Sequence, residues 1–110
     1  MTARSLDRTL AALADPQRRR VVDLLRERPR RAGELAEAAR TSFPTMSRQL
    51  RTLRESGLVE EARDQLDGRV RIYRLRSEPM SELKAWLEQT EQMWAEQLAA
   101  FKAHVKKARR

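Results

Sequence analysis

The chain has 110 residues, no cysteine and a formal net charge of +8, with 24 Lys and Arg against 16 Asp and Glu. This length predicts one domain that buries roughly two-thirds of its unfolded surface and has little room for an enclosed active site. Disulfides and thiolate metal sites are excluded, no apolar run approaches the roughly 20 residues that span a bilayer, and no signal-peptide core is present. We therefore expect a soluble, cytoplasmic protein with no membrane association, and the charge favours nucleic acid or another anionic partner.

The positive charge is concentrated in the middle of the chain. Residues 16–76 contain sixteen Arg and nine acidic residues, a net charge of +7, whereas residues 77–110 sum to only +1. We therefore expect a single domain over residues 1–110 in which residues 16–76 form the DNA-binding core. Residues 1–15 and 77–110 are left for another task.

Two helices are predicted before residue 28. Residues 5–14 place Leu6, Leu10 and Leu13 on one face of a first helix. Asp15-Pro16 then marks the start of a second helix that runs to about Glu27, because Asp can cap a helix and Pro is tolerated in its first turn. Its apolar residues are expected to face inward and its arginines largely outward: Val21, Val22, Leu24 and Leu25 on one side, Arg18, Arg19, Arg20 and Arg26 on the other.

A helix-turn-helix arrangement follows. The basic connector 28–31 leads into a short helix over residues 32–39, and its Arg31 is either part of a solvated loop or a phosphate contact. After a brief turn, the next helix is delimited on both sides, with Ser42 as its N-cap and Gly57 as the positive-φ residue after its end. A short helix, a tight turn and a second helix are the parts of this motif.

The helix between Ser42 and Gly57 is the predicted DNA reader. Met46, Leu50 and Leu53 recur at i, i+4 and i+7 and form one narrow apolar stripe. Arg can read guanine in the major groove, Gln can read adenine, and hydroxyls can reach bases or phosphates. An ordinary solvated face is the alternative interpretation of a single amphipathic helix. The candidate DNA-contacting residues are Ser42, Pro44, Thr45, Ser47, Arg48, Gln49 and Arg51.

A β-hairpin is predicted after this helix. Leu58-Val59 begins a β-rich segment, Asp67-Gly68 is the best hairpin-turn signal in the chain, and an alternating pattern continues over residues 70–75. Two strands joined by an arginine-bearing tip would make a wing beside the reading helix. Its candidate contacts to phosphates or to the minor groove are Arg63, Arg69 and Arg71.

A long amphipathic helix is predicted from Pro79 to about Val105. No helix breaker interrupts it, its length is on the order of 40 Å, and apolar residues recur at spacings of three and four. The stripe carries both tryptophans, so we expect part of it to pack on the first helix and the rest to meet a second copy of the chain. Packing within one chain is the alternative. The expected dimer-interface residues are Leu6, Leu10, Leu87, Trp94, Leu98 and Phe101.

Several motifs in chain order resemble those of ArsR-type winged-helix repressors, above all the metal-independent branch with a long tryptophan-bearing last helix. They are Leu13-Ala14-Asp15-Pro16-Gln17-Arg18-Arg19, Gly33-Glu34-Leu35-Ala36, the pattern from Ser42 to Val59, and Gly68-Arg69 with Tyr73 and Leu75. The resemblance implies a mainly α winged helix-turn-helix with a small β-hairpin wing. It also implies a homodimer through the first and last helices, reading helices in successive major grooves, and repression, often of the protein's own operon.

The same resemblance implies roles for single residues. Base-reading positions fall on Pro44, Thr45, Ser47, Arg48 and Gln49, and wing contacts fall on Arg69 and Arg71. Three residues depart from the family pattern. Arg40 stands where Gly is common, so a positive φ there would cost roughly 1 kcal/mol. Phe43 replaces a polar or basic residue and either touches a thymine methyl or packs locally, and Gln49 stands where His is frequent.

The leading hypothesis is a sequence-specific, homodimeric transcriptional regulator, most simply a repressor, that binds double-stranded operator DNA at an imperfect palindrome. The alternative is a winged-helix module whose basic face binds an acidic protein partner. With one histidine, His104, the sequence offers no catalytic set, cofactor motif or metal site. A pair of His104 residues with Glu91 or Glu96 across a dimer is the one conceivable metal arrangement. A small apolar effector could bind near Trp86 and Trp94, although a tryptophan stripe is usually an interface.

Overall fold

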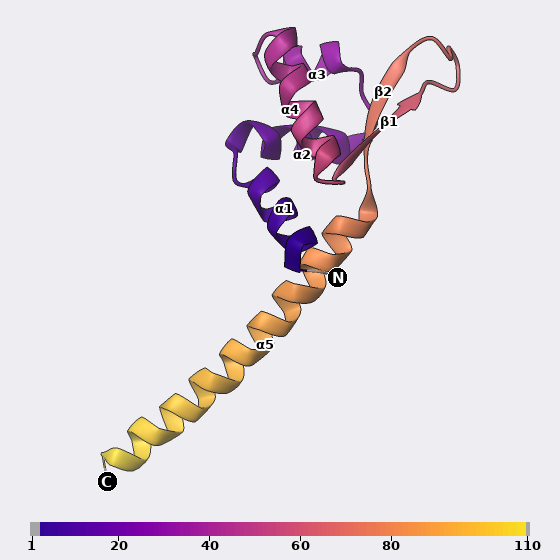
Figure 1. Cartoon of the computed structure of the whole chain (residues 1–110). Helices are drawn as coiled ribbons and strands as arrows, with labels where there is room; N and C mark the ends of the chain where they lie inside the picture. The colour runs from indigo at the N-terminus through magenta and orange to yellow at the C-terminus, as the bar shows by residue number, and fades with distance from the viewer. Residues whose placement is uncertain (1–2, 110) are drawn as a thin grey trace.

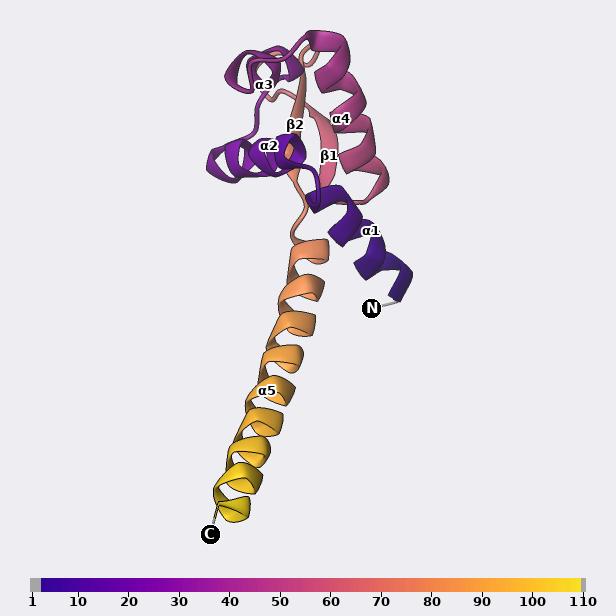
Figure 2. The same cartoon turned by 90° about the vertical axis from the view of Figure 1, so that its left-hand side faces the viewer.

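The computed structural model describes residues 3–109, which form five helices and one β-hairpin (Figure 1). In chain order the elements are α1 (Ala3–Leu13), α2 (Pro16–Glu27), α3 (Ala32–Ala38), α4 (Phe43–Glu55), β1 (Val59–Arg63), β2 (Arg71–Leu75) and α5 (Ser77–Ala108). This is the predicted winged helix-turn-helix order. The central elements form a head, and α5 extends away from it, as the view turned by 90° also shows (Figure 2).

The starts of α2 and α4 follow the capping signals in the sequence. Asp15 Oδ1 accepts hydrogen bonds from the N–H groups of Gln17 at 2.8 Å and Arg18 at 3.2 Å. Ser42 Oγ accepts one from the N–H of Thr45 at 3.2 Å. These contacts satisfy donors that the first turn of a helix otherwise leaves without a partner. Both helices therefore begin at the residues that the sequence predicts.

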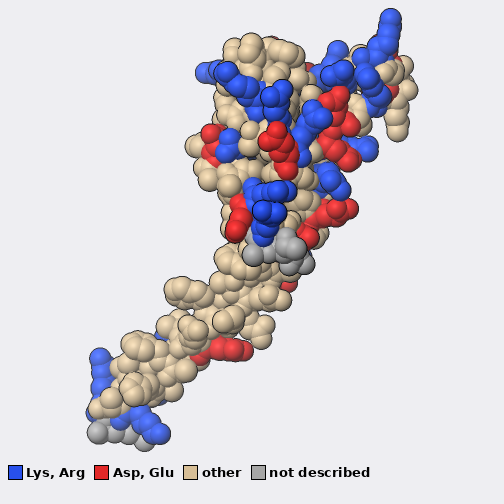
Figure 3. Space-filling model, viewed as in Figure 1, with Lys and Arg blue, Asp and Glu red and all other residues tan. Residues whose placement is uncertain are grey.

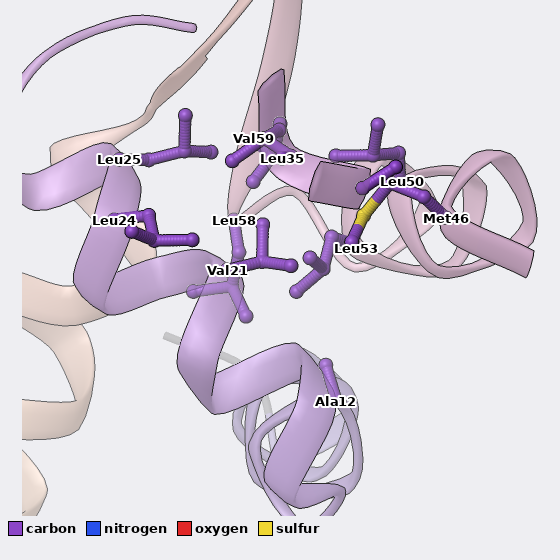
Figure 4. Packing of buried hydrophobic residues seen from close by; sticks show 11 residues of the cluster. Ala12, Val21, Leu24, Leu25, Leu35, Met46, Leu50, Leu53, Leu58 and Val59 are labelled. Atoms are coloured by element: carbon purple, nitrogen blue, oxygen red, sulfur yellow. The ribbon is translucent and has the colours of Figure 1, made fainter. Parts of the chain in front are cut away.

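The hydrophobic core lies where α1, α2, α3, α4 and β1 meet (Figure 4). Met46, Leu50 and Leu53 of α4 are all at most 1% exposed, as the predicted stripe requires. Full burial of one such side chain contributes roughly 1.5–3 kcal/mol, so this stripe anchors α4 firmly by one edge. The other members of the core are Ala12, Val21, Leu24, Leu25, Leu35, Ala36, Leu58 and Val59.

The fully buried side chains of α1 are small, and Leu13 packs against the edge of the core. Thr9 and Ala12 are its buried residues, whereas Leu6 is half-buried and Leu10 is 40% exposed. The Thr9 hydroxyl donates to the carbonyl of Ser5 at 3.1 Å, so a polar residue is buried here at little cost. α1 packs against both α2 and α5, and Leu10 is left at the surface.

The wing is a two-stranded antiparallel hairpin with a longer connection than expected. Val59 lies opposite Leu75, and Arg63 lies opposite Arg71. The predicted turn at Asp67-Gly68 exists, but it lies inside a loop over residues 64–70, whose ends are joined by a 2.9 Å hydrogen bond from Asp64 N–H to Val70 O. Asp67 Oδ1 accepts the Arg69 N–H at 3.0 Å, and this bond lowers the pKa of Asp67.

Helix α5 begins earlier than predicted, at Ser77, and ends at Ala108, a length of roughly 48 Å. Only its first turns are covered, by contact with α1, and its buried residues are Pro79 and Leu83. Beyond them the large apolar residues are exposed, and Trp94 is 72% exposed. The stripe is therefore not buried within one chain. No helix within residues 3–109 is long and apolar enough to cross a membrane.

The turn between α3 and α4 contains a left-handed residue. Arg40 has φ 55°, the conformation that the usual glycine at this position suggested. Its N–H donates to Glu37 O at 3.1 Å, and the N–H of Thr41 donates to Ala36 O at 3.0 Å. This pair of bonds is a Schellman motif, which ends a helix with a positive φ and thereby fixes the angle between α3 and α4.

We expect Arg40→Gly to raise the free energy of unfolding by about 1 kcal/mol, because glycine adopts positive φ without strain from a Cβ. Urea titration at equal protomer concentration measures this change. Arg40→Ala is the matched control, since it also removes the guanidinium but keeps the Cβ. Equal gains in the two variants would assign the effect to charge and not to the backbone.

Candidate nucleic-acid interface

Arginine side chains gather on the head and on the wing of the molecule, and basic side chains also mark the far end of α5 (Figure 3). Two elements present this charge together: α4, which the core holds by one edge, and the hairpin beside it. Arg69 at the wing tip has a side chain that is 92% exposed. The surface therefore combines a helix and a basic loop, the two parts expected of a DNA-reading winged helix.

The exposed face of α4 carries most of the predicted contact residues. Pro44, Ser47, Arg48 and Arg51 are exposed, and Ser42 lies at the helix start. Thr45 is half-buried, and its hydroxyl accepts hydrogen bonds from Ser42 Oγ at 2.9 Å and Arg48 Nη2 at 3.3 Å. The first turn thus holds its hydroxyls in place, while Ser47, Arg48 and Arg51 extend along one side of the helix.

Gln49 is separated from these residues. It is half-buried on the side of α4 that faces α2. Its Oε1 accepts a hydrogen bond from Arg18 Nη1 at 3.0 Å, and its Nε2 donates to Gln17 Oε1 at 2.9 Å. Recognition of adenine would need the same acceptor and donor. In this structure both groups of the amide are already paired within the protein.

The expectation that Arg18 faces outward from α2 is wrong, because its side chain is turned back towards the protein. It is only 19% exposed, and its Nε donates to Ala12 O at 2.7 Å and its Nη2 to Ala11 O at 3.2 Å. The last carbonyls of a helix have no partner within the helix, so a guanidinium folded back from α2 satisfies those of α1. The arginine run after Pro16 gave no sign of this, because the partners belong to the preceding helix and to α4.

An ion-pair network ties the wing to α4. Glu61 on β1 lies 3.2 Å from Arg54 Nη1 and 3.3 Å from Arg71 Nε, with one carboxylate oxygen for each. Arg54 is in the last turn of α4 and Arg71 begins β2, so a single carboxylate holds helix and hairpin at a fixed separation. Arg63 lies opposite Arg71 at the end of the ladder and is exposed.

The basic connector before α3 divides into two roles. Arg30 is largely buried and caps α2, with Nε donating to Leu24 O at 3.1 Å. Arg28 pairs with Glu34 at 2.9 Å, and this hydrogen bond holds the pKa of Glu34 below its usual value. Arg31 Nε lies 3.8 Å from Glu34 Oε1, its side chain is 63% exposed, and it remains the candidate phosphate contact of this segment.

A groove of about 510 Å³ separates the start of α3 from the wing. Arg31, Phe43, Ser47, Arg71 and Tyr73 are among its lining residues. Phe43 is 58% exposed here, so it is not packed into the core. The groove thus brings candidates from the connector, α4 and β2 to one place. Their predicted contacts to DNA stay predictions.

Ligands for a metal do not cluster in the described part of the chain. No group of three or more His, Cys, Asp or Glu residues within residues 3–109 is arranged to hold a metal ion. His104 is exposed near the far end of α5.

The comparisons with known proteins agree with this geometry. The family model for bacterial regulatory proteins of the arsR family matches residues 15–61. A relative from Mycobacterium tuberculosis, the HTH-type transcriptional regulator Rv2034, is 34% identical over 100 residues, which are 91% of this chain and 88% of the relative.

Solved structures extend the likeness to the whole fold. An ArsR-like transcriptional regulator from Rhodococcus sp. RHA1 is 27% identical, with a TM-score of 0.83 over 97% of this chain and 98% of that one. The homodimeric winged helix-turn-helix DNA-binding domain of Mb0332 from Mycobacterium bovis is 28% identical, with a TM-score of 0.62 over 84% of this chain and 83% of that one.

The lowered pKa of Glu34 predicts a pH-dependent contribution to stability. A carboxylate with a depressed folded-state pKa stabilises the protein above its unfolded pKa and loses this effect as pH falls through the folded value. We therefore expect Glu34→Gln to lower the free energy of unfolding at pH 7, and the difference from wild type to shrink below pH 4.5, the ordinary value for this group. Urea titrations across this range test it. Glu37→Gln, an exposed change on the same helix, is expected to show no such trend.

Proposed function

The chain belongs to the ArsR family of bacterial regulatory proteins, and we propose that it acts as a homodimer that represses transcription by occupying an imperfect palindrome in operator DNA. It is a DNA-binding transcriptional regulator. The observation that carries the finer proposal is the exposed arginine face of α4 beside an arginine-bearing wing, both held by one core. A dimer on its operator would exclude other proteins from that stretch of cytoplasmic DNA, including its own promoter if the operator lies there.

Within this proposal, α4 enters the major groove and reads bases. Arg48 is the principal reader, since an exposed guanidinium can bond guanine O6 and N7 together. Ser47 adds a hydroxyl, while Ser42, Pro44 and Thr45 set the approach of the first turn. Five further exposed arginines contact phosphates or the minor groove: Arg31, Arg51, Arg63, Arg69 and Arg71.

The dimer would form through the uncovered stripe of α5 and the exposed leucine of α1. Leu87, Trp94, Leu98 and Phe101 are each at least half exposed in the single chain, an apolar surface that monomeric proteins rarely present. The charges of α5 favour an antiparallel pair. Residues 77–92 contain four Glu and one Lys, whereas residues 93–109 contain one Glu and four basic residues, so antiparallel helices place opposite charges together.

A two-fold axis through this seam also sets the form of the DNA site. Two copies of α4 related by that axis would lie in successive major grooves on one side of the duplex. The half-sites should then be about one helical turn apart, roughly 10 bp from centre to centre. Selection of bound duplexes from a random library by the purified protein tests this directly. An imperfect palindrome with this spacing supports the proposal, and equal binding of all duplexes in moderate salt would overturn it.

We expect Arg48→Ala and Arg69→Ala to weaken operator binding in different ways. Arg48→Ala should cost about 1–3 kcal/mol on the selected operator and relax the preference at one base pair, because it removes a direct base contact. Arg69→Ala should weaken binding to all duplexes alike and lower the slope of log K against log[salt] by about 1, because it removes a phosphate contact. Fluorescence anisotropy on operator, single-base variants and random DNA measures both. Identical specificity profiles for the two variants would contradict this division.

We expect Trp94→Glu to give a monomer with little operator affinity, because it introduces a charge into the centre of the proposed seam. Sedimentation and anisotropy measure the two effects. Gln92→Glu is the matched control, since it makes the same charge change on the opposite face of α5 and should leave both measurements near wild type. A monomeric wild-type protein that still binds its palindrome tightly would refute the dimer.

A further inference from the structure

We propose that Gln49 and Arg18 form a positioning link between α1 and the reading helix, and that Gln49 reads no base. The inference rests on the proposed function, because it assigns a role within DNA binding to the α1–α4 geometry. Gln49 lies next to Arg48 in sequence, yet its side chain turns towards α2 while the arginine is exposed. The following contacts carry the assignment.

Arg18 joins three elements through one planar group. It belongs to α2, its Nε and Nη2 hold the carbonyls of Ala12 and Ala11 at the end of α1, and its Nη1 donates to Gln49 Oε1 on α4. A guanidinium presents its donors in a fixed fork. The orientation of the α1 end and that of the Gln49 amide are therefore set by the same rigid group.

The other half of the amide is fixed as well. Gln49 Nε2 donates to Gln17 Oε1 at 2.9 Å, so the side-chain amide accepts one hydrogen bond and donates another. Asp15 in turn accepts the backbone N–H groups of both Gln17 and Arg18. The partners of Gln49 are thus anchored by the cap of α2 and do not lie on a mobile loop.

Packing alone does not join α1 to the reading helix along its length. A cleft of about 450 Å³ lies between them, with Arg8 and Ala11 on the α1 side and Thr52, Glu55 and Ser56 on the α4 side. Arg18 also borders this cleft. Its bonds to Gln49 and to the carbonyls of Ala11 and Ala12 therefore bridge the two helices beside this cleft.

This bridge has a consequence for a dimer that reads two half-sites. α1 packs on α5, and these two helices carry the proposed dimer surface, so their placement sets the distance between the two copies of α4. A loosened bridge would let each α4 tilt relative to the dimer axis. All base contacts would then weaken together, whereas loss of a base reader weakens one position.

A double-mutant cycle tests the assignment. Gln49→Ala and Arg18→Lys, which keeps the charge, are each expected to lower operator affinity roughly three- to tenfold, because the lost hydrogen bonds position α4 and do not touch DNA. The loss should be the same at every single-base variant of the selected operator, the salt slope should not change, and the double variant should be no weaker than the weaker single variant. Ser47→Ala is the control on the same helix, and its loss should depend on one base pair.

A second measurement needs no DNA and separates this inference from the proposed function. Hydrogen exchange should show lower protection at the end of α1 and in the second turn of α4 in both variants, whatever the protein binds. If Arg18→Lys does not fold, Gln17→Ala replaces it in the cycle. A changed preference at one base pair in Gln49→Ala, additive losses in the cycle, or unchanged protection would each overturn the link. Failure of wild type to select any duplex would instead refute the proposed function.

Discussion

The attachment of α4 by a single edge is the constraint on which the molecule depends. Three side chains, Met46, Leu50 and Leu53, enter the core, and no residue on the opposite edge is needed for packing. That edge can therefore carry arginine and small hydroxyl residues without loss of stability. The capped start at Ser42, the positive φ of Gly57 and the Glu61 ion pairs then fix where this edge lies relative to the wing.

The arginines of the head are not equivalent, although they contribute equally to the net charge. Arg18 and Arg30 are largely buried and complete the ends of helices α1 and α2. Arg54 and Arg74 are paired with Glu61 and Glu60 on the wing. The charge of the middle segment thus overstates what is presented to DNA, and the proposed contact set along α4, the connector and the wing is smaller than the number of arginines.

The sequence predicted the order of elements, the caps and the stripe of α4 because each of these depends on residues within one or two helical turns. It did not predict the roles of Arg18, Gln49 and Thr9. Arg18 and Gln49 are 31 positions apart, and their bond exists only once α1, α2 and α4 are assembled. Thr9 is buried although the expected inner face of α1 held only leucines, and its hydroxyl donates to Ser5 O. The wing loop is longer than a two-residue turn at Asp67-Gly68, because this dipeptide locates a turn but not the ends of the two strands.

In the proposed dimer, the bare outer half of α5 would make operator binding depend on the abundance of the chain. The large apolar residues on this half of the helix are exposed in a single chain, so they gain stability from burial against the second copy proposed above. At low copy number the chains would stay single and the paired reading surface would not exist. Operator occupancy would then rise with the square of the chain concentration. Repression would depend steeply on the amount of protein without any effector.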